Sequence, residues 1–185
     1  MMRDIDIWLE RLSSLYRSQM RQVANSEGIQ PVHVEILQYL SICNRYSNTA
    51  QALSEYLGQT KGSISQSLKL LEKEGYVERQ SSPEDKRVAL LFLTPKAKAS
   101  IERMSANIMP NLGEPKGASD TVKALLMDWQ RNNNHRGFGQ CQSCRFNRSL
   151  PGGEFQCGLT GAPLSKIEIK QICREHEFEN LAERQ

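Results

Sequence analysis

The stretch ALSEYLGQTKGSISQSLKLLEKEGYVERQSSPEDKRVALLFLT, residues 52–94, decides the fold of this chain. It predicts a short helix over residues 49–58, the turn LGQT, and a second helix over residues 60–75 that Thr60 caps and Gly75 ends. The strand-like runs YVERQ and VALLFLT then flank the polar turn SSPEDK, which predicts a β-hairpin. This order of elements predicts a helix-turn-helix followed by a wing.

The two central helices divide their residues between a core face and an outer face. The apolar residues that would hold the helices together are Ala52, Leu53, Leu57, Ile64, Leu68 and Leu71. The residues of the second helix that we expect to contact DNA are Thr60, Lys61, Ser63, Ser65, Gln66 and Lys69. Hydroxyl and amide groups reach base edges in the major groove, whereas lysines meet phosphates. The alternative interpretation is a winged helix that binds only protein.

The residues on either side of this stretch predict further helices. A helix over residues 5–23 is predicted by apolar residues at three- and four-residue steps: Ile5, Trp8, Leu9, Leu12, Leu15, Tyr16 and Met20. Pro31 suits the start of a second helix, and Pro95 the start of a long helix that ends at Met109. A last helix over residues 119–133 precedes the polar linker RNNNHRGFG. The predicted fold class is therefore mainly α with a small β-hairpin wing.

Residues 52–94 resemble the winged helix-turn-helix of the MarR-type bacterial transcription regulators. The most specific part is the wing, where Asp85, Lys86 and Arg87 followed by LLFLT are similar to the D-x-R signature of that family. The resemblance implies that Arg87 enters the minor groove and that Asp85 orients it. A guanidinium suits the negative potential of a narrow minor groove. The alternative is a solvated pair of charges in a turn, which contributes little.

The resemblance extends in element order over residues 5–130, and it implies a homodimer that reads a pseudo-palindromic site in double-stranded DNA. The dimerisation region would comprise residues 1–30 and 95–134, and the winged helix-turn-helix residues 31–94. Residues 135–185 depart from the family and would form a separate four-cysteine segment that binds a metal or cluster.

Much of this family responds to small phenolic or lipophilic ligands, but no group of residues in this sequence identifies such a ligand. Trp8, Tyr16 and His33 would suit the wall of a pocket, although aromatic residues at helical spacing more often belong to the core. A lone histidine such as His33 is more often a satisfied core or surface residue than a ligand. We expect Cys43, near the end of the second helix, to be a small buried residue.

Composition excludes several other classes of protein. Hydrophobic residues make up 38% of the 185 residues and charged residues 24%, which is typical of a globular chain. No apolar run approaches the roughly 20 residues that span a bilayer, and the charged start MMRDIDIWLERL is unlike a signal peptide. We therefore expect a cytoplasmic protein with no membrane partner and with reduced thiols. No nucleophile–base pair or phosphate loop is present, so we expect no enzyme.

Four of the five cysteines fall within the last quarter of the chain, in the pattern C-x2-C-x12-C-x15-C. They are Cys141, Cys144, Cys157 and Cys173. Four thiolates are the right number for a tetrahedral zinc ion or an iron–sulfur cluster. Incidental cysteines rarely cluster in this way, and a reducing compartment disfavours disulfides. The pattern therefore predicts a metal site.

The identity of the metal is open between two alternatives. Zinc would take three cysteines with either Cys173 or His176 as the fourth ligand. One close pair and two single cysteines instead resemble the ligands of high-potential iron–sulfur proteins and small cluster-binding subunits. That resemblance implies a [4Fe-4S] cluster, or a [2Fe-2S] cluster as the less favoured form. Phe138, Phe146 and Phe155 would shield it from water.

These alternatives lead to three predicted functions. With a cluster, the tail would sense oxygen, redox state or iron supply, and unfolding of residues 141–176 would act through the helix 119–133 on the spacing of the recognition helices. With structural zinc, the regulator would take its signal from a small molecule. The third function is an electron-transfer or accessory protein whose winged helix binds a protein partner.

Overall fold

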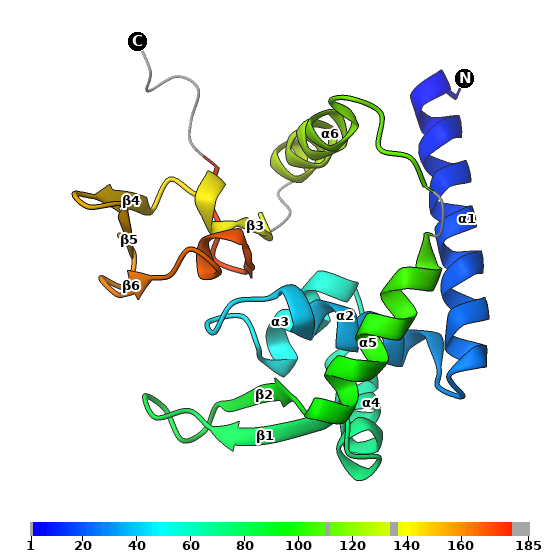
Figure 1. The fold of residues 1–185 in the computed structure, drawn as a ribbon, viewed down its shortest axis with the longest axis horizontal. Helices are drawn as coiled ribbons and strands as arrows, with labels where there is room; N and C mark the ends of the chain where they lie inside the picture. Colours follow the sequence, from blue (N-terminus) through cyan, green and yellow to red (C-terminus); the bar gives the residue numbers. More distant parts are fainter. Residues whose placement is uncertain (1, 110–111, 134–136, 179–185) are drawn as a thin grey trace. The chain divides into compact units, whose positions relative to one another are not determined.

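A computed structural model describes residues 2–109, 112–133 and 137–178 of the chain (Figure 1). The chain forms two compact units, which are described separately. The first unit consists of Met1–Ser41 and Lys61–Gly113, and the second of Ile42–Thr60 and Glu114–Gln185. The second unit therefore combines the C-terminal tail with a segment from the middle of the chain.

The first unit contains helices and the wing hairpin, as the sequence predicts. Its elements are α1 (Asp4–Ser26), α2 (Pro31–Ile42, whose last residue falls in the second unit), α4 (Lys61–Lys73), β1 (Val77–Ser81), β2 (Ala89–Leu93) and α5 (Pro95–Ile108). Strands β1 and β2 pair antiparallel, with Val77 opposite Leu93 and Ser81 opposite Ala89. The fold class is confirmed, and α5 ends one residue before the predicted Met109.

Helix ends in the first unit follow the capping residues of the sequence. Gly28 has a φ of 69° just beyond α1, a left-handed conformation that glycine adopts without a Cβ clash. The Thr94 hydroxyl accepts a hydrogen bond from the Ala97 amide at 3.2 Å and donates one to the Gly75 carbonyl at 2.8 Å. Thr94 therefore caps α5 and also ties its start to the turn that ends α4.

The core of the first unit lies between its helices and the hairpin. Its buried apolar residues include Val34, Ile36, Leu37, Ile64, Leu68, Leu71, Leu91, Ala97 and Met104. At the end of α1, the Glu27 carboxylate accepts hydrogen bonds from Ser100 at 3.0 Å and from Arg103 at 2.9 Å. These contacts fix α5 against α1.

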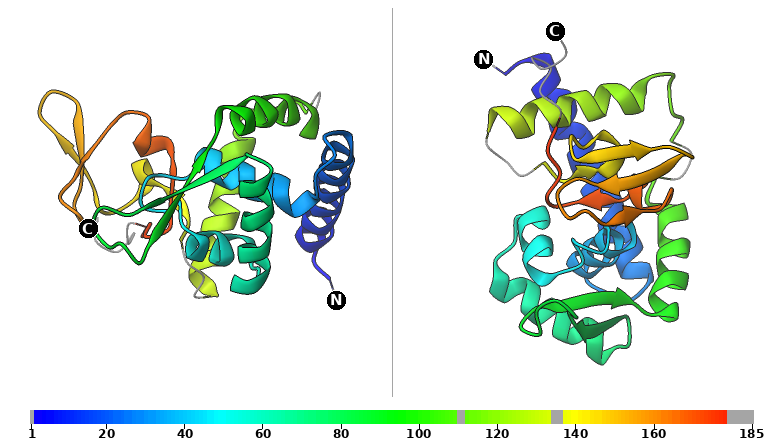
Figure 2. Two further views of the ribbon diagram at one scale, coloured as in Figure 1. Left: turned by 90° about the horizontal axis from the view of Figure 1, so that it is seen from below. Right: turned by 90° about the vertical axis from the view of Figure 1, so that its left-hand side faces the viewer.

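The second unit begins with helix α3 (Ala50–Leu57). The hydroxyl of Thr49 caps it by accepting a hydrogen bond from the Ala52 amide at 3.2 Å, and Gly58 ends it with a φ of 63°. After α6 (Ala118–Asn132), the tail forms a three-stranded antiparallel sheet and a two-stranded one (Figure 2). Its elements are β3 (Gly139–Gln140), η1 (Cys141–Ser143), β4 (Asn147–Leu150), β5 (Glu154–Cys157), β6 (Pro163–Leu164), η2 (Glu168–Lys170) and β7 (Ile172–Cys173). The sheets are β4-β5-β6 and β3-β7.

The tail has only a small core, centred on Cys141, Leu164 and Ile169. The side chains packed against this core are Tyr46, Phe155, Cys157 and Cys173. Tyr46 lies in the segment 42–60, outside the tail. The tail therefore takes part of its packing from residues outside itself.

Helices α1 and α6 each expose apolar side chains. On α1 these are Ile5, Ile7, Trp8, Leu12, Leu15 and Tyr16, and on α6 Val122, Leu125, Leu126 and Trp129. Trp8 is 68% exposed and Tyr16 is 38% exposed, so the expectation that these aromatic residues belong to the core of the chain is wrong. Every residue of α6 is described, and none of its side chains is buried. Apolar faces of this kind favour contact with another surface.

Within the described residues, no helix is long and apolar enough to cross a membrane. The predicted regions 1–30, 31–94, 95–134 and 135–185 are functional assignments and stay predictions. The compact units differ from them at the segment 42–60 and at residues 114–134, which both belong to the unit of the tail.

Replacing Thr94 by alanine tests the capping role of its hydroxyl. We expect Thr94→Ala to lower the free energy of unfolding by about 1–2 kcal/mol, because it removes both hydrogen bonds at the start of α5. Urea denaturation followed by circular dichroism measures the change. Thr121→Ala is the control, since Thr121 lies on α6 and its exposed hydroxyl donates a hydrogen bond to the Gly117 carbonyl just before that helix. A loss of similar size in both variants would contradict the capping role.

Candidate nucleic-acid interface and cysteine site

Helix α4 presents a polar face opposite its buried one. Ile64, Leu68 and Leu71 are fully buried, which fixes the orientation of the helix. Of the predicted DNA-contacting residues, Thr60, Lys61, Gln66 and Lys69 are exposed, and Ser63 and Ser65 are half-buried. Of the six apolar residues expected to hold the central helices, five are buried and Leu57 is half-buried. The predicted core face of α4 thus agrees with its burial, and the DNA contacts stay a prediction.

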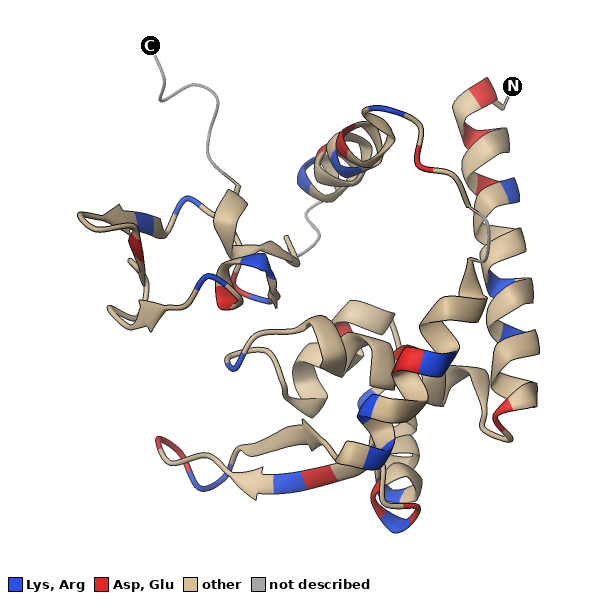
Figure 3. Ribbon diagram, viewed as in Figure 1, with Lys and Arg blue, Asp and Glu red and all other residues tan. Residues whose placement is uncertain are grey.

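The wing carries an ordered pair of charges near its tip (Figure 3). The Asp85 carboxylate accepts hydrogen bonds from the Arg87 backbone amide at 2.9 Å and from Arg87 Nε and Nη2 at 3.1 and 3.2 Å. These hydrogen bonds hold the pKa of Asp85 below its usual range. The Arg87 side chain is 91% exposed, so the pair contributes little to stability. Its structural effect is to fix the direction of the guanidinium.

The four tail cysteines line one small cavity in the second unit. Cys141 comes from η1, Cys144 follows it directly, Cys157 ends β5, and Cys173 lies in β7. The other lining residues are Asn44, Tyr46, Phe146, Asn147, Leu159, Leu164 and Glu175. The fold thus brings together the four predicted ligands, which are up to 32 positions apart in the sequence.

Hydrogen bonds reach the cysteine sulfurs from the tail and from the middle of the chain. Asn44 Nδ2 donates to Cys141 Sγ at 3.4 Å, and the Glu177 amide donates to Cys144 Sγ at 3.5 Å. A hydrogen bond from the Cys141 thiol to Cys173 raises the pKa of Cys141 and lowers that of Cys173. Burial raises the pKa of Cys144. Donors of this kind stabilise thiolates, which are the form that binds metals.

The four tail cysteines suit a metal that binds thiolates. Their side chains must rotate before all four sulfurs can reach one ion. Four sulfurs suit zinc or an iron–sulfur cluster and not a hard cation such as magnesium. A tetrahedral zinc ion with Zn–S bonds of about 2.3 Å would place its sulfurs about 3.8 Å apart. Among residues 2–109, 112–133 and 137–178, no three Cys, His, Asp or Glu side chains already converge on one ion position. The cavity volume is about 20 Å³, room for about one water molecule, so a cluster also requires the thiols to move.

His176 lies apart from the cysteine cavity. Its Nε2 is 3.1 Å from the Ser143 hydroxyl, and its ring faces Gly139, where a Cβ would lie 2.7 Å from the imidazole. Burial lowers the pKa of His176 to about 4. Cys173 lines the cavity and His176 is not among the described residues that do so. The geometry therefore favours Cys173 over His176 as the fourth ligand.

The three phenylalanines predicted to shield a cluster occupy different places. Phe146 lines the cavity, and Phe155 packs against the small tail core that contains Cys141. Phe138 is buried and stacks edge-on against Tyr56 of α3, with ring centroids 5.2 Å apart. Sequence reasoning missed Asn44 and Tyr46, since they lie about 100 positions before the cysteines and match no ligand motif.

Cys43 and His33 are both buried, but only Cys43 is as expected, because the Nε2 of His33 has no hydrogen-bond partner among the described residues. Cys43 is 6% exposed, and burial raises the pKa of its thiol to about 12. Cys43 is therefore a poor thiolate, unlike a reactive cysteine. His33 is 3% exposed, and burial lowers its pKa.

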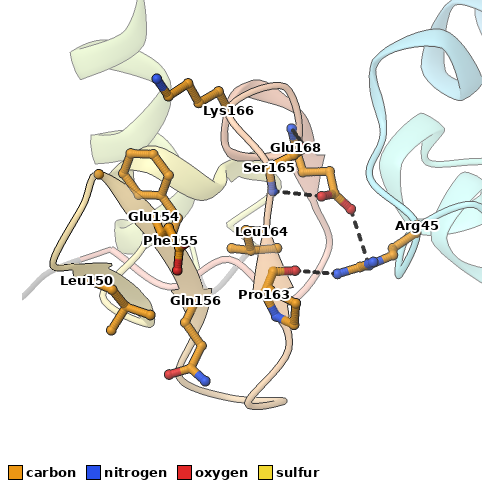
Figure 4. Close-up of a pocket in the computed structure, with 11 residues that line it drawn as sticks. Arg45, Leu150, Glu154, Phe155, Gln156, Pro163, Leu164, Ser165, Lys166 and Glu168 are labelled. Carbon is orange, nitrogen blue, oxygen red and sulfur yellow. Dashed lines mark hydrogen bonds and ion pairs between the residues drawn. The ribbon is translucent and has the colours of Figure 1, made fainter.

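A larger cavity of about 550 Å³ lies beside the three-stranded sheet of the tail (Figure 4). Arg45 reaches its wall from the segment 42–60. Its Nη2 donates to the Pro163 carbonyl at 2.6 Å, and its Nε lies 3.2 Å from a Glu168 carboxylate oxygen. The charges of Arg45 and Glu168 thus neutralise each other, and the pair joins this segment to the tail.

Residues 27–88 match the model of the MarR family. No curated protein matches the chain. Among solved structures, the chain resembles transcriptional regulator PA3341 at 22% identity and a TM-score of 0.59, with 71% of this chain and 99% of that one covered. It also resembles CouR from Rhodococcus jostii RHA1 bound to p-coumaroyl-CoA, at 17% identity and a TM-score of 0.58, with 68% and 91% covered. A MarR-family regulator from Silicibacter pomeroyi matches at 19% identity and a TM-score of 0.57, with 68% and 87% covered.

These matches leave nearly a third of this chain without a counterpart in the three structures. PA3341 and the Silicibacter pomeroyi protein are both described as transcriptional regulators. Residues 27–88 are thus similar to the MarR family, and the likeness to these structures shows a shared fold.

Proposed function

We propose that this protein is a homodimeric, DNA-binding transcription regulator whose C-terminal tail binds an iron–sulfur cluster, with [4Fe-4S] favoured. The DNA-binding part rests on the match of residues 27–88 to the MarR family. The cluster part rests on one observation, which is that all four tail cysteines line one cavity.

In this proposal, α4 lies in the major groove and the wing reaches the adjacent minor groove. Gln66 and the serines of α4 face base edges, while Lys61 and Lys69 meet phosphates. Arg87 enters the minor groove in the direction that Asp85 gives it, and Lys86 lies beside it at the tip. The predicted DNA-contacting residues all lie on α4, just before it, or in the wing.

The exposed apolar faces of α1 and α6 support the homodimer. A second copy of the chain would cover Trp8, Leu12 and Leu15 on α1, and Leu126 and Trp129 on α6. A two-fold dimer presents two copies of α4, which matches a pseudo-palindromic site in DNA.

Cys141, Cys144, Cys157 and Cys173 would hold the cluster, and Phe146 would cover part of it. A cluster supplies sensitivity to oxygen, redox state or iron, whereas zinc supplies only a structural crosslink. Asn44 and the Glu177 amide donate to ligand sulfurs, and such hydrogen bonds tune reduction potential. The alternative is structural zinc on the same thiols, with a small molecule as the signal.

DNA binding can be tested at the wing. We expect Arg87→Ala to weaken binding to a duplex selected by the wild-type protein from a random pool by about 5–150-fold, or about 1–3 kcal/mol. Fluorescence anisotropy at several salt concentrations measures affinity and its salt dependence. Lys98→Ala removes an equal charge from α5 and should leave affinity nearly unchanged. Binding that is insensitive to salt and to Arg87 would favour the third predicted function, a winged helix that binds protein.

The metal content can be tested by purification without oxygen. We expect a visible absorption spectrum, with iron and acid-labile sulfide in matched amounts, and we expect Cys157→Ser to lose both because it removes one ligand. Cys43→Ala is the matched control, since Cys43 is the one cysteine of the chain outside the cavity lining. A colourless protein with one zinc per chain would establish the zinc alternative.

The homodimer can be tested on α1. We expect Leu12→Glu to convert the protein from dimer to monomer in sedimentation experiments, because it places a charge in the apolar face. Arg11→Glu, at the neighbouring exposed position, should remain dimeric. A wild-type protein that sediments as a monomer at micromolar concentration would contradict the proposed dimer.

A further inference from the structure

We propose that the segment 42–60, which contains the first helix of the helix-turn-helix, is part of the cysteine site and opens and closes together with it. Binding of a metal or cluster would therefore hold α3 in place directly. This inference rests on the proposed metal site, and it names the route by which that site reaches the DNA-binding domain.

The first link is a chain of hydrogen bonds through Asn44, a side chain that is 2% exposed. Its Nδ2 donates to Cys141 Sγ at 3.4 Å, while its Oδ1 accepts from the Ser47 hydroxyl at 2.8 Å. The Ser47 oxygen in turn accepts from the Arg174 amide at 2.8 Å. This chain connects Cys141 with the residue that follows Cys173.

The second link is formed by the backbone on the other side of Cys173. The Asn44 amide donates to the Ile172 carbonyl at 2.9 Å, and Cys43 forms a parallel bridge with Ile172. The segment 42–60 thus bonds to the residues before and after Cys173. Any movement that displaces this ligand must break these bonds or carry the segment with it.

The third link reaches α3 itself. Arg174 Nε and Nη2 donate to the two carboxylate oxygens of Glu55 at 2.6 and 2.9 Å. The Arg174 side chain is 18% exposed, so this bidentate pair is partly shielded from water. Phe138 packs against Tyr56 one residue further along α3. Residues 58–60 alone separate α3 from α4 in the chain.

These links favour a different route from the one predicted through helix 119–133. All of α6 is described and it buries no side chain, whereas the segment 42–60 buries Asn44, Ser47 and Asn48. Tyr46 also packs on the core that contains Cys141. A ligand that binds only the closed site stabilises every part of the protein that opens with it, and by the same amount.

Amide hydrogen exchange of the full-length protein tests this coupling. Apo protein, stripped with chelator and reductant, is compared with protein reconstituted with ferrous and ferric iron together with sulfide, and separately with Zn²⁺ alone. At a metal concentration about 100-fold above the dissociation constant, exchange through the opening of the site should slow by about 100-fold. We expect amide exchange of residues 141–176 and of residues 43–57 to slow by the same factor. Amide exchange in α5 should remain unchanged.

Two outcomes would overturn the inference, and they are distinguishable. If residues 141–176 slow while residues 43–57 do not, the metal site stands and the coupling is wrong. If neither iron with sulfide nor Zn²⁺ binds to the protein or slows amide exchange in the tail, the proposed metal site is wrong. The inference then fails with it.

The Glu55→Gln variant localises the link to α3. It removes one charge of the Glu55–Arg174 pair at an accessible position, and metal content should stay at the wild-type value. We expect residues 50–57 to lose most of the metal-dependent slowing, while residues 141–176 keep it. Glu72→Gln is the control, because it removes one charge of the Glu72–Arg79 pair, whose atoms lie 2.8 Å apart in the first unit. Unchanged slowing of residues 50–57 in Glu55→Gln would overturn the role of this pair.

Discussion

The cysteine-bearing tail depends on packing that it cannot supply itself. A segment of about 40 residues with a three-residue buried core exposes too much apolar surface to fold independently. The segment 42–60 provides what is missing: the Tyr46 ring on the core, the Asn44 side chain on a sulfur, and a carboxylate for Arg174. The same segment forms α3 of the winged helix, so the sequence between α2 and α4 must satisfy two partners at once.

Thiol chemistry makes this shared packing conditional on what the cysteines bind. The four cysteines are buried or half-buried, and thiolates that form so close together repel one another. A thiophilic metal cation removes this repulsion because it neutralises the thiolate charge. Without a metal, the Cys141 thiol donates a hydrogen bond to Cys173. This hydrogen bond is weaker than a bond from either sulfur to a metal. Because metal binding and folding of such small sites are coupled, the stability of the tail would report metal supply or oxidation if the proposed site binds a metal.

Local signals predicted most of the winged helix. Thr49, Gly58, Thr94 and Pro95 mark helix ends by chemistry that acts within a few residues; α3 falls within the predicted range 49–58, and α5 begins at Pro95 as predicted. The four thiols were also predictable as a set, because C-x2-C and two later cysteines have few other uses in a reduced chain. Asn44 and Glu55 were not, since their partners Cys141 and Arg174 lie about 100 positions away. Trp8 was misassigned because helical periodicity reveals an apolar face but not whether the chain itself covers that face.

The location of the links on α3 limits how a signal at the cysteines can act on DNA. A change transmitted through a dimer helix would alter the distance between the two recognition helices. Affinity for DNA would then fall because this distance no longer matches the spacing of the half-sites. A change transmitted through Arg174 and Glu55 instead acts within one subunit, on the helix that precedes α4 by three residues. In the proposed mechanism, loss of order in α3 would reach α4 through the three residues that join them and would weaken binding at each half-site by itself. Such a mechanism needs no change in the proposed dimer, so the exposed faces of α1 and α6 would remain available to a second copy of the chain in both states.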